Sequence, residues 1–193
     1  TSVAGNEKIK NIADIVSKAQ KNNKIIVVLS AMAGETNKLQ SYLDEFGSQN
    51  TLESDLVLTS GEQVTIGLLS AALKNKGIKS IPLLGWQIPI ITDQNYEKAK
   101  ILKIDKKRIE EYFKNYEVIV LAGFQGISTN GYITSLGRGG SDTTAVAIAS
   151  AIDAERCDIY TDVEGVFTTD PNIEKIAKKI SKLSYEEMLE MSS

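Results

Sequence analysis

Two long apolar runs most constrain the fold of this chain: IIVVLS at residues 25–30 and VIVLAGF at residues 118–124. Neither run alternates apolar with polar residues, as a strand with one face in water does. Continuous apolar strands are typical of parallel sheets that helices cover on both faces. We therefore expect a parallel sheet at the centre of the molecule, with both runs buried in it.

Helical patterns alternate with these strands along the chain. The first covers residues 6–20, where the residues at helical spacing are Ile9, Ile12, Ala13 and Val16. Further helices are expected at residues 36–46, 62–75, 106–114 and 141–154, the second of them buried. Further strands are expected at residues 81–85 and 157–163, mixed strand and loop at 86–103, and a hairpin around Asn130 and Gly131. This alternation predicts an α/β three-layer sandwich with a mostly parallel central sheet, whose ligands bind beyond the carboxyl ends of the strands.

Composition excludes several classes of function. A chain of 193 residues with 42% hydrophobic residues can bury the core of one domain. The formal charge of −3 and the pI of 5.2 argue against a nucleic-acid partner. No apolar stretch has the length of a membrane span, and no signal peptide is visible. Cys157 is the one cysteine, so an internal disulfide is impossible and a reducing cytoplasm is favoured.

The chain contains no histidine. That excludes Ser-His-Asp and Cys-His catalytic pairs and any metal site that needs imidazole. Neither the P-loop pattern nor the G-x-G-x-x-G pattern of dinucleotide-binding folds occurs. Chemistry must therefore depend on carboxylates, lysines, arginines, hydroxyls and backbone amides.

The segment LGRGGSDTT at residues 136–144 is the richest in candidate functional residues. A glycine-rich turn that enters a helix exposes backbone N–H groups and the positive end of the helix dipole, which bind phosphate or carboxylate. Arg138 adds a planar guanidinium suited to a carboxylate. The alternative is an ordinary hairpin return in which Ser141 or Asp142 only caps the helix.

Two other segments carry acidic residues at candidate positions. In TSGEQ, Glu62 begins an otherwise apolar helix, where it either interacts with the helix dipole or receives the ammonium group of an amino acid. YTDVEGVFTTDP, at residues 160–171, follows the last expected strand. It either covers a nucleotide or binds metal through Asp162, or it is a solvated connection.

Taken together and in order, several segments resemble the aspartate kinases of the amino-acid kinase family: TSV, VVLSAMAGETN, SGEQVTIGLLS, GFQG, LGRGGSDTT, IYTDVEGVFTTDP and EEMLEM. The resemblance implies one amino-acid kinase catalytic domain over residues 1–193. It implies transfer of the γ-phosphoryl group of ATP to the side-chain carboxylate of L-aspartate, with Mg²⁺, as the first step toward lysine, threonine and methionine. It further implies a cytoplasmic protein, expected to be a homo-oligomer.

The resemblance also implies roles for particular residues. Aspartate is expected to be held by Thr36, Glu62, Arg138 and Ser141, with Glu62 near its ammonium and Arg138 on a carboxylate. Asp142 and Arg138 are expected to be catalytic. The expected nucleotide-binding residues are Ser30, Gly139, Gly140, Thr161, Asp162, Phe167 and Asn172. No metal ligand is assigned, and Asp142 and Asp162 are candidates.

The chain departs from the family pattern at several points. Family members begin with K-F-G-G-T-S-V, whose lysine touches the phosphates, whereas this chain begins at TSV. The chain also ends soon after a helix expected to begin at Ser184, before the C-terminal regulatory domains common in the family, so we expect a fragment. Because the lysine that touches the phosphates is missing, we expect this fragment to be weak or inactive alone. Phe167 stands where tyrosine is common, and Asn172 where many relatives have an arginine.

Two other hypotheses about the function remain at this point. The chain is alternatively a relative that phosphorylates glutamate, acetylglutamate, carbamate or a nucleotide. It is alternatively a non-catalytic fragment that binds a ligand or regulates.

Overall fold

The computed structural model describes residues 5–160, 174, 176–178 and 180. The chain divides into two compact units, one from Ser2 to Asp158 and a second that includes Ile159–Ser193. Few residues of the second unit are described, so the architecture below is that of the first. The helix expected at Ser184 lies outside the described residues.

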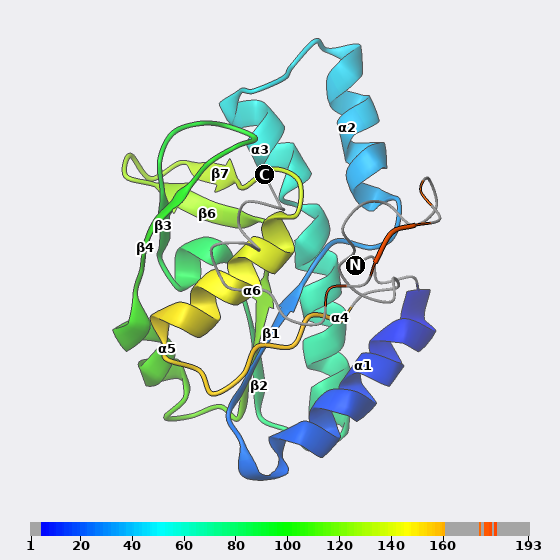
Figure 1. The fold of residues 1–193 in the computed structure, drawn as a ribbon, viewed down its shortest axis with the longest axis vertical. Coiled ribbons are helices and arrows are strands. Elements are labelled where there is room, and N and C mark those ends of the chain that lie inside the picture. The colour runs from blue at the N-terminus through cyan, green and yellow to red at the C-terminus, as the bar shows by residue number, and fades with distance from the viewer. Residues whose placement is uncertain (1–4, 161–173, 175, 179, 181–193) are drawn as a thin grey trace. The chain divides into compact units, whose positions relative to one another are not determined.

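The central strand is β5 (Val118–Ala122), and every one of its residues is buried. It pairs in parallel with β1 (Ile25–Leu29) on one side and β2 (Ser80–Leu83) on the other (Figure 1). The expectation of full burial is confirmed for β5 and wrong for most of β1, where only Leu29 is buried. β1 has a single neighbouring strand in the described part of the chain, so it is less enclosed than β5.

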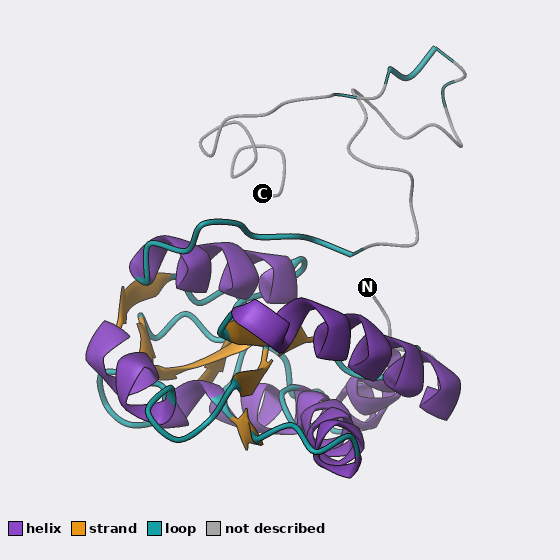
Figure 2. Cartoon of the chain, turned by 90° about the horizontal axis from the view of Figure 1, so that it is seen from below, coloured by secondary structure: helices purple, strands orange, loops and turns teal. Residues whose placement is uncertain are grey.

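Helices cover both faces of this sheet, as Figure 2 shows from below. On one face, α1 (Gly5–Ala19) and α4 (Gly61–Asn75) pack against Val118 and Val120. On the other, α5 (Lys106–Tyr112) and α6 (Gly140–Ala151) pack against Ile119 and Leu121. Alternate residues of β5 therefore enter two separate cores. The three-layer α/β sandwich with a parallel sheet is confirmed.

A second sheet of four strands has the order β4-β3-β6-β7. Its strands are β3 (Ile90–Thr92), β4 (Ile101–Ile104), β6 (Gln125–Ser128) and β7 (Ile133–Ser135). The predicted hairpin is confirmed as β6 and β7, closed by a hydrogen bond from Ser128 N to Tyr132 O of 2.8 Å. The region of mixed strand and loop contains β3, β4 and the short 3₁₀ helix η2 (Gly85–Gln87).

Of the remaining helical segments, α2 (Glu35–Glu45) was expected and two others were not. One of these two is the 3₁₀ turn η1 (Gln20–Asn22), which extends α1. α3 (Leu52–Leu58) was not expected, although Thr51 and Ser54 form a reciprocal capping box at its start. The box has serine in place of the usual glutamate or glutamine, which weakened the sequence signal.

The strand expected at residues 157–163 is wrong for its described part. Residues 157–160 have no regular secondary structure, and residues 161–163 lie outside the described residues. No described strand pairs with residues 157–160. An apolar segment without a hydrogen-bonded neighbour does not form a strand.

The expectation that no apolar stretch has the length of a membrane span is wrong by length and composition alone, because one stretch in the described part of the chain, Leu52–Asn75, meets both criteria. An 18-residue window of this stretch has a mean hydropathy of 1.4, and half of that window is buried. The stretch is not one helix, because α3 ends at Leu58 and α4 begins at Gly61. It also carries two buried carboxylates, Asp55 and Glu62. These features are those of helices in a protein core, which meet the same criteria of length and composition.

Two adjacent leucines of α4 test which side of this helix packs against the sheet. Leu69 is fully buried against β5, whereas 39% of Leu68 is exposed. We expect Leu69→Ala to lower the free energy of unfolding by about 2–5 kcal/mol because it leaves a cavity. The matched control Leu68→Ala should cost about 1 kcal/mol or less. Urea denaturation measures both, and equal losses would contradict the assignment.

Candidate active site at the carboxyl ends of β1 and β5

The carboxyl ends of β1 and β5 lie next to each other. Leu29 pairs with Ala122, and Gly123 N donates a hydrogen bond of 2.9 Å to Leu29 O just beyond the strands. From β1 the chain runs through a short loop into α2, and from β5 it passes through the β6–β7 hairpin into α6. In open α/β sheets this edge is where ligands bind.

Glu62, in the first turn of α4, lies at the end of β1. Its Oε1 accepts a hydrogen bond of 2.9 Å from Ala31 N, and 3% of the residue is exposed. Its Oε2 is buried and has no hydrogen-bond partner among the described residues. Desolvation raises the pKa of Glu62 from 4.5 to about 7, although the hydrogen bond from Ala31 opposes the increase. A buried carboxylate with one unpaired oxygen is suited to a cationic ligand.

Close packing holds α4 against the end of β1. A Cβ at Gly61 would lie 2.8 Å from Ala31 Cβ, so only glycine allows this approach. Thr65 Oγ1 lies 2.9 Å from both Ser30 O and Glu62 O, within hydrogen-bonding distance of each. These contacts place Glu62 at the strand end. Thr65 was not predicted, because its partner Ser30 lies 35 residues away and no local pattern indicates the pair.

The start of α6 has the form of an anion-binding turn. Gly137 and Gly139 have φ values of +76° and +73°, a left-handed conformation that favours glycine. Gly139 is the N-cap, and no side chain of the described residues caps the helix, so the alternative in which Ser141 or Asp142 serves as the cap is wrong. The backbone N–H groups of Ser141 and Asp142 have no partner among the described residues. They are therefore available to a phosphate or a carboxylate.

The first turn of α6 lies directly against the end of β5. A Cβ at Gly123 would be 2.7 Å from Ser141 Oγ and 2.9 Å from Ser141 Cα. The next residue, Phe124, has a φ of +67°, and its N–H donates a hydrogen bond of 3.1 Å to Thr144 Oγ1. Glu62 is thus at the end of β1 and Ser141 at the end of the adjacent strand β5.

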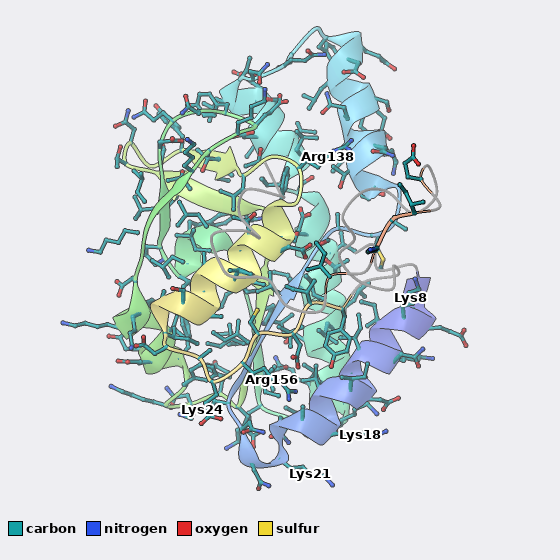
Figure 3. The ribbon with its side chains drawn as sticks, viewed as in Figure 1. Lys8, Lys18, Lys21, Lys24, Arg138 and Arg156 are labelled. Atoms are coloured by element: carbon teal, nitrogen blue, oxygen red, sulfur yellow. The ribbon has the colours of Figure 1, made fainter. Side chains whose placement is uncertain are left out.

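The other predicted residues have the following positions. Ser30 is half-buried just after β1, and Thr36 is exposed in the first turn of α2, which begins after Gly34 at a φ of +78°. Figure 3 shows Arg138 in the loop that enters α6, where it is exposed and forms no ion pair with a described residue. Asp142 is half-buried. The expected nucleotide residues that lie outside the described residues are Thr161, Asp162, Phe167 and Asn172.

Within the described ranges, no three acidic or cysteine side chains gather in a way that holds a metal ion. Of the two candidate metal ligands, Asp142 alone is described. A single carboxylate beside an anion-binding turn suits Mg²⁺, which usually keeps several waters and shares phosphate oxygens with the protein.

Comparison with known proteins identifies the family of this chain. The family model described as the amino acid kinase family matches residues 1–193. The curated aspartokinase of Rickettsia felis is 50% identical over 198 residues, which cover 100% of this chain and 49% of that protein. The chain spans about half the length of the curated relatives it matches.

Two solved structures also match over nearly the whole chain. The aspartate kinase from Synechocystis has a TM-score of 0.76 and 39% identity, covering 99% of this chain and 32% of that one. The E. coli aspartokinase III in complex with aspartate and ADP has a TM-score of 0.76 and 25% identity, covering 98% of this chain and 55% of that one. Both similarities include the α/β architecture described above.

The burial of Glu62 predicts how stability depends on pH. In the unfolded chain this carboxyl ionises near pH 4.5, whereas in the folded chain it keeps its proton until about pH 7. Between these values the unfolded state binds fewer protons, so the free energy of unfolding falls as pH rises, by roughly 3 kcal/mol. The isosteric control Glu62→Gln lacks this contribution.

Urea denaturation of both proteins, from below pH 4.5 to above pH 7, measures the effect. The stability of the wild type relative to Glu62→Gln should decrease across that interval. A difference that does not vary with pH would show that Glu62 ionises normally in the folded state.

Proposed function

The chain belongs to the amino acid kinase family, and from that premise we propose that it forms the catalytic domain of an aspartate kinase. The proposed reaction transfers the γ-phosphoryl group of ATP to the side-chain carboxylate of L-aspartate. The names of its relatives and the aspartate and ADP of one solved neighbour support this substrate pair. We propose that residues 1–193 form one catalytic domain.

The observation that carries the proposal is the unpaired oxygen of Glu62. Glu62 is 3% exposed, so its buried carboxylate needs hydrogen-bond donors, and the described residues supply one to only one of its oxygens. The ammonium group of an amino acid supplies both the missing donor and a positive charge. Glu62 therefore favours a free amino acid as the phosphoryl acceptor over a nucleotide or carbamate.

Arg138 and the first turn of α6 complete the proposed site. The exposed guanidinium of Arg138 has no ion-pair partner in the described part of the chain and can bind a carboxylate of aspartate. The N–H groups of Ser141 and Asp142, which have no partner among the described residues, fit the phosphates of ATP, and the absence of a side chain at Gly123 lets this turn of α6 lie against the end of β5. We assign Asp142 to Mg²⁺ and Thr36 and Ser30 to the surrounding contacts with aspartate and phosphate.

The mechanism requires positioning and charge neutralisation more than acid–base chemistry. The accepting carboxylate is already ionised at neutral pH, so no residue has to remove a proton from it. Glu62 holds the ammonium and Arg138 a carboxylate, which orients aspartate for in-line attack. When bound, Mg-ATP supplies the phosphoryl group and part of the charge neutralisation. The N–H groups of α6 stabilise negative charge that develops beside them.

Family membership also leads us to propose a cellular setting. The product, aspartyl phosphate, is the first intermediate toward lysine, threonine and methionine. We propose a cytoplasmic location and assembly into a homo-oligomer. Thr161, Asp162, Phe167 and Asn172 are proposed to contact the nucleotide.

A hydroxylamine trap for acyl phosphate tests the function. The product of the complete gene that contains this chain, with Mg-ATP, is expected to yield hydroxamate from L-aspartate and not from glutamate or acetylglutamate. The 193-residue chain, assayed alongside, tests the expectation that it is weak alone. Failure to trap acyl phosphate with any carboxylate acceptor would refute the proposal.

Arginine variants provide the control for this assay. Arg138→Ala should raise the KM for aspartate by about 10- to 100-fold, the cost of a charge-assisted pair. Arg108 is also exposed, but it is ion-paired with Glu111 on α5, away from the site. Arg108→Ala should leave the KM unchanged.

The pKa of Glu62 predicts a pH profile. Because only the ionised carboxylate attracts an ammonium group, kcat/KM for aspartate should rise with pH and level off above about pH 7. Glu62→Gln should give a lower and flatter profile, while the titration of ATP affects both proteins equally. Profiles of the same shape in the two proteins would remove Glu62 from the ammonium site.

A further inference from the structure

Asp55, on α3, is a fully buried carboxylate with no place in the mechanism above. Three donors surround it. Ser135 N donates to Oδ2 at 2.7 Å, Ser135 Oγ donates to Oδ1 at 2.7 Å, and Glu97 N donates to Oδ1 at 2.9 Å. Desolvation raises the pKa of Asp55, and these three hydrogen bonds favour the ionised form. Replacing the carboxylate would leave these buried donors without an acceptor, which has a high cost in free energy.

Both partners of Asp55 contact the loop that carries Arg138. Ser135 ends β7, three residues before Arg138. Glu97 contacts the loop from the other side, because a Cβ at Gly137 would lie 2.8 Å from Glu97 O. One carboxylate therefore holds both the strand that leads into the Arg138 loop and the backbone on which that loop rests.

Glu97 is itself held in an uncommon conformation. Its φ is +62°, a left-handed value that is unfavourable for a residue with a side chain. Two contacts maintain it: the bond from Glu97 N to Asp55, and a bond of 2.6 Å from Asn50 N to Glu97 Oε1. Without Asp55, the first of these contacts is lost, and the backbone of Glu97, against which Gly137 packs, is free to shift.

Asp55 also lies in the segment of the chain that leads to Glu62. Thr59 N and Thr59 Oγ1 donate to Asp55 O at 3.1 and 2.7 Å, which closes the end of α3. Thr59 O accepts a hydrogen bond of 3.1 Å from Gln125 Nε2 at the start of β6. Glu62 follows three residues after Thr59, at the start of α4.

We propose that Asp55 is a positioning residue that sets Arg138 at the correct place relative to Glu62, so that the two side chains bind one aspartate molecule. This inference rests on the proposed function. Asp55 does not touch the substrate in this arrangement. It acts through Ser135 and Glu97 on the loop that presents Arg138.

Two variants and a control test the proposal in the complete gene product. Asp55→Asn replaces an acceptor by a donor that faces another donor, and should raise the KM for aspartate by about tenfold or more. Ser135→Ala removes one hydrogen bond and keeps the other two, and should raise it roughly five- to tenfold. The KM for ATP should change less than about threefold in both.

The control is Ser70→Ala, which breaks the buried hydrogen bond of 3.0 Å between Ser70 Oγ and Ser80 Oγ on another part of α4. It should lower the melting temperature and leave the KM for aspartate unchanged. If Asp55→Asn does not fold, Ser135→Ala carries the test.

A double-mutant cycle with Arg138→Ala separates positioning from general stabilisation. If Asp55 acts through Arg138, adding Ser135→Ala or Asp55→Asn to Arg138→Ala should raise the KM for aspartate no further. Additive effects, or folded variants with a normal KM in an active enzyme, would overturn the inference and leave the proposed function intact. A wild type that phosphorylates no aspartate would overturn both.

Discussion

The buried strand β5 organises this molecule. Its five residues are fully enclosed because β1 and β2 pair with its edges and helices cover both of its faces. Alternation along the strand sends Val118 and Val120 into one core and Ile119 and Leu121 into the other. The C-terminal end of β5 meets the first turn of α6 at Gly123, where no side chain fits. The same strand therefore supports the core and positions the anion-binding turn.

Desolvation gives the candidate site its chemical character. Glu62 is held by one backbone N–H while its second oxygen lies buried without a described partner. The cost of burying that charge raises its pKa to about 7, near the pH at which metabolic enzymes operate. A cationic group of the substrate would remove this cost by supplying the missing partner. Asp55 is also buried, but its three donors make it part of the framework rather than a ligand site.

Much of the fold could be predicted because its signals are local. The apolar run of β5, the helical spacing of Ile9 to Val16 and the Asn130-Gly131 turn each depend on neighbouring residues. α3 was missed because its capping box uses serine. The strand expected at residues 157–163 was wrong for its described part, residues 157–160, because strand formation also needs a pairing partner that the local sequence does not reveal.

The sequence by itself determined the α/β class, the glycine-rich turn before α6, the candidates Glu62 and Arg138, and the resemblance to amino acid kinases. These depend on residue type and spacing along the chain. Only the tertiary structure decided that Gly139 rather than Ser141 or Asp142 is the cap of α6, that one buried oxygen of Glu62 has no partner among the described residues, and that Asp55 bonds to Ser135, 80 residues away. Burial and long-range hydrogen bonds depend on which distant segments meet, and chain packing alone sets those contacts.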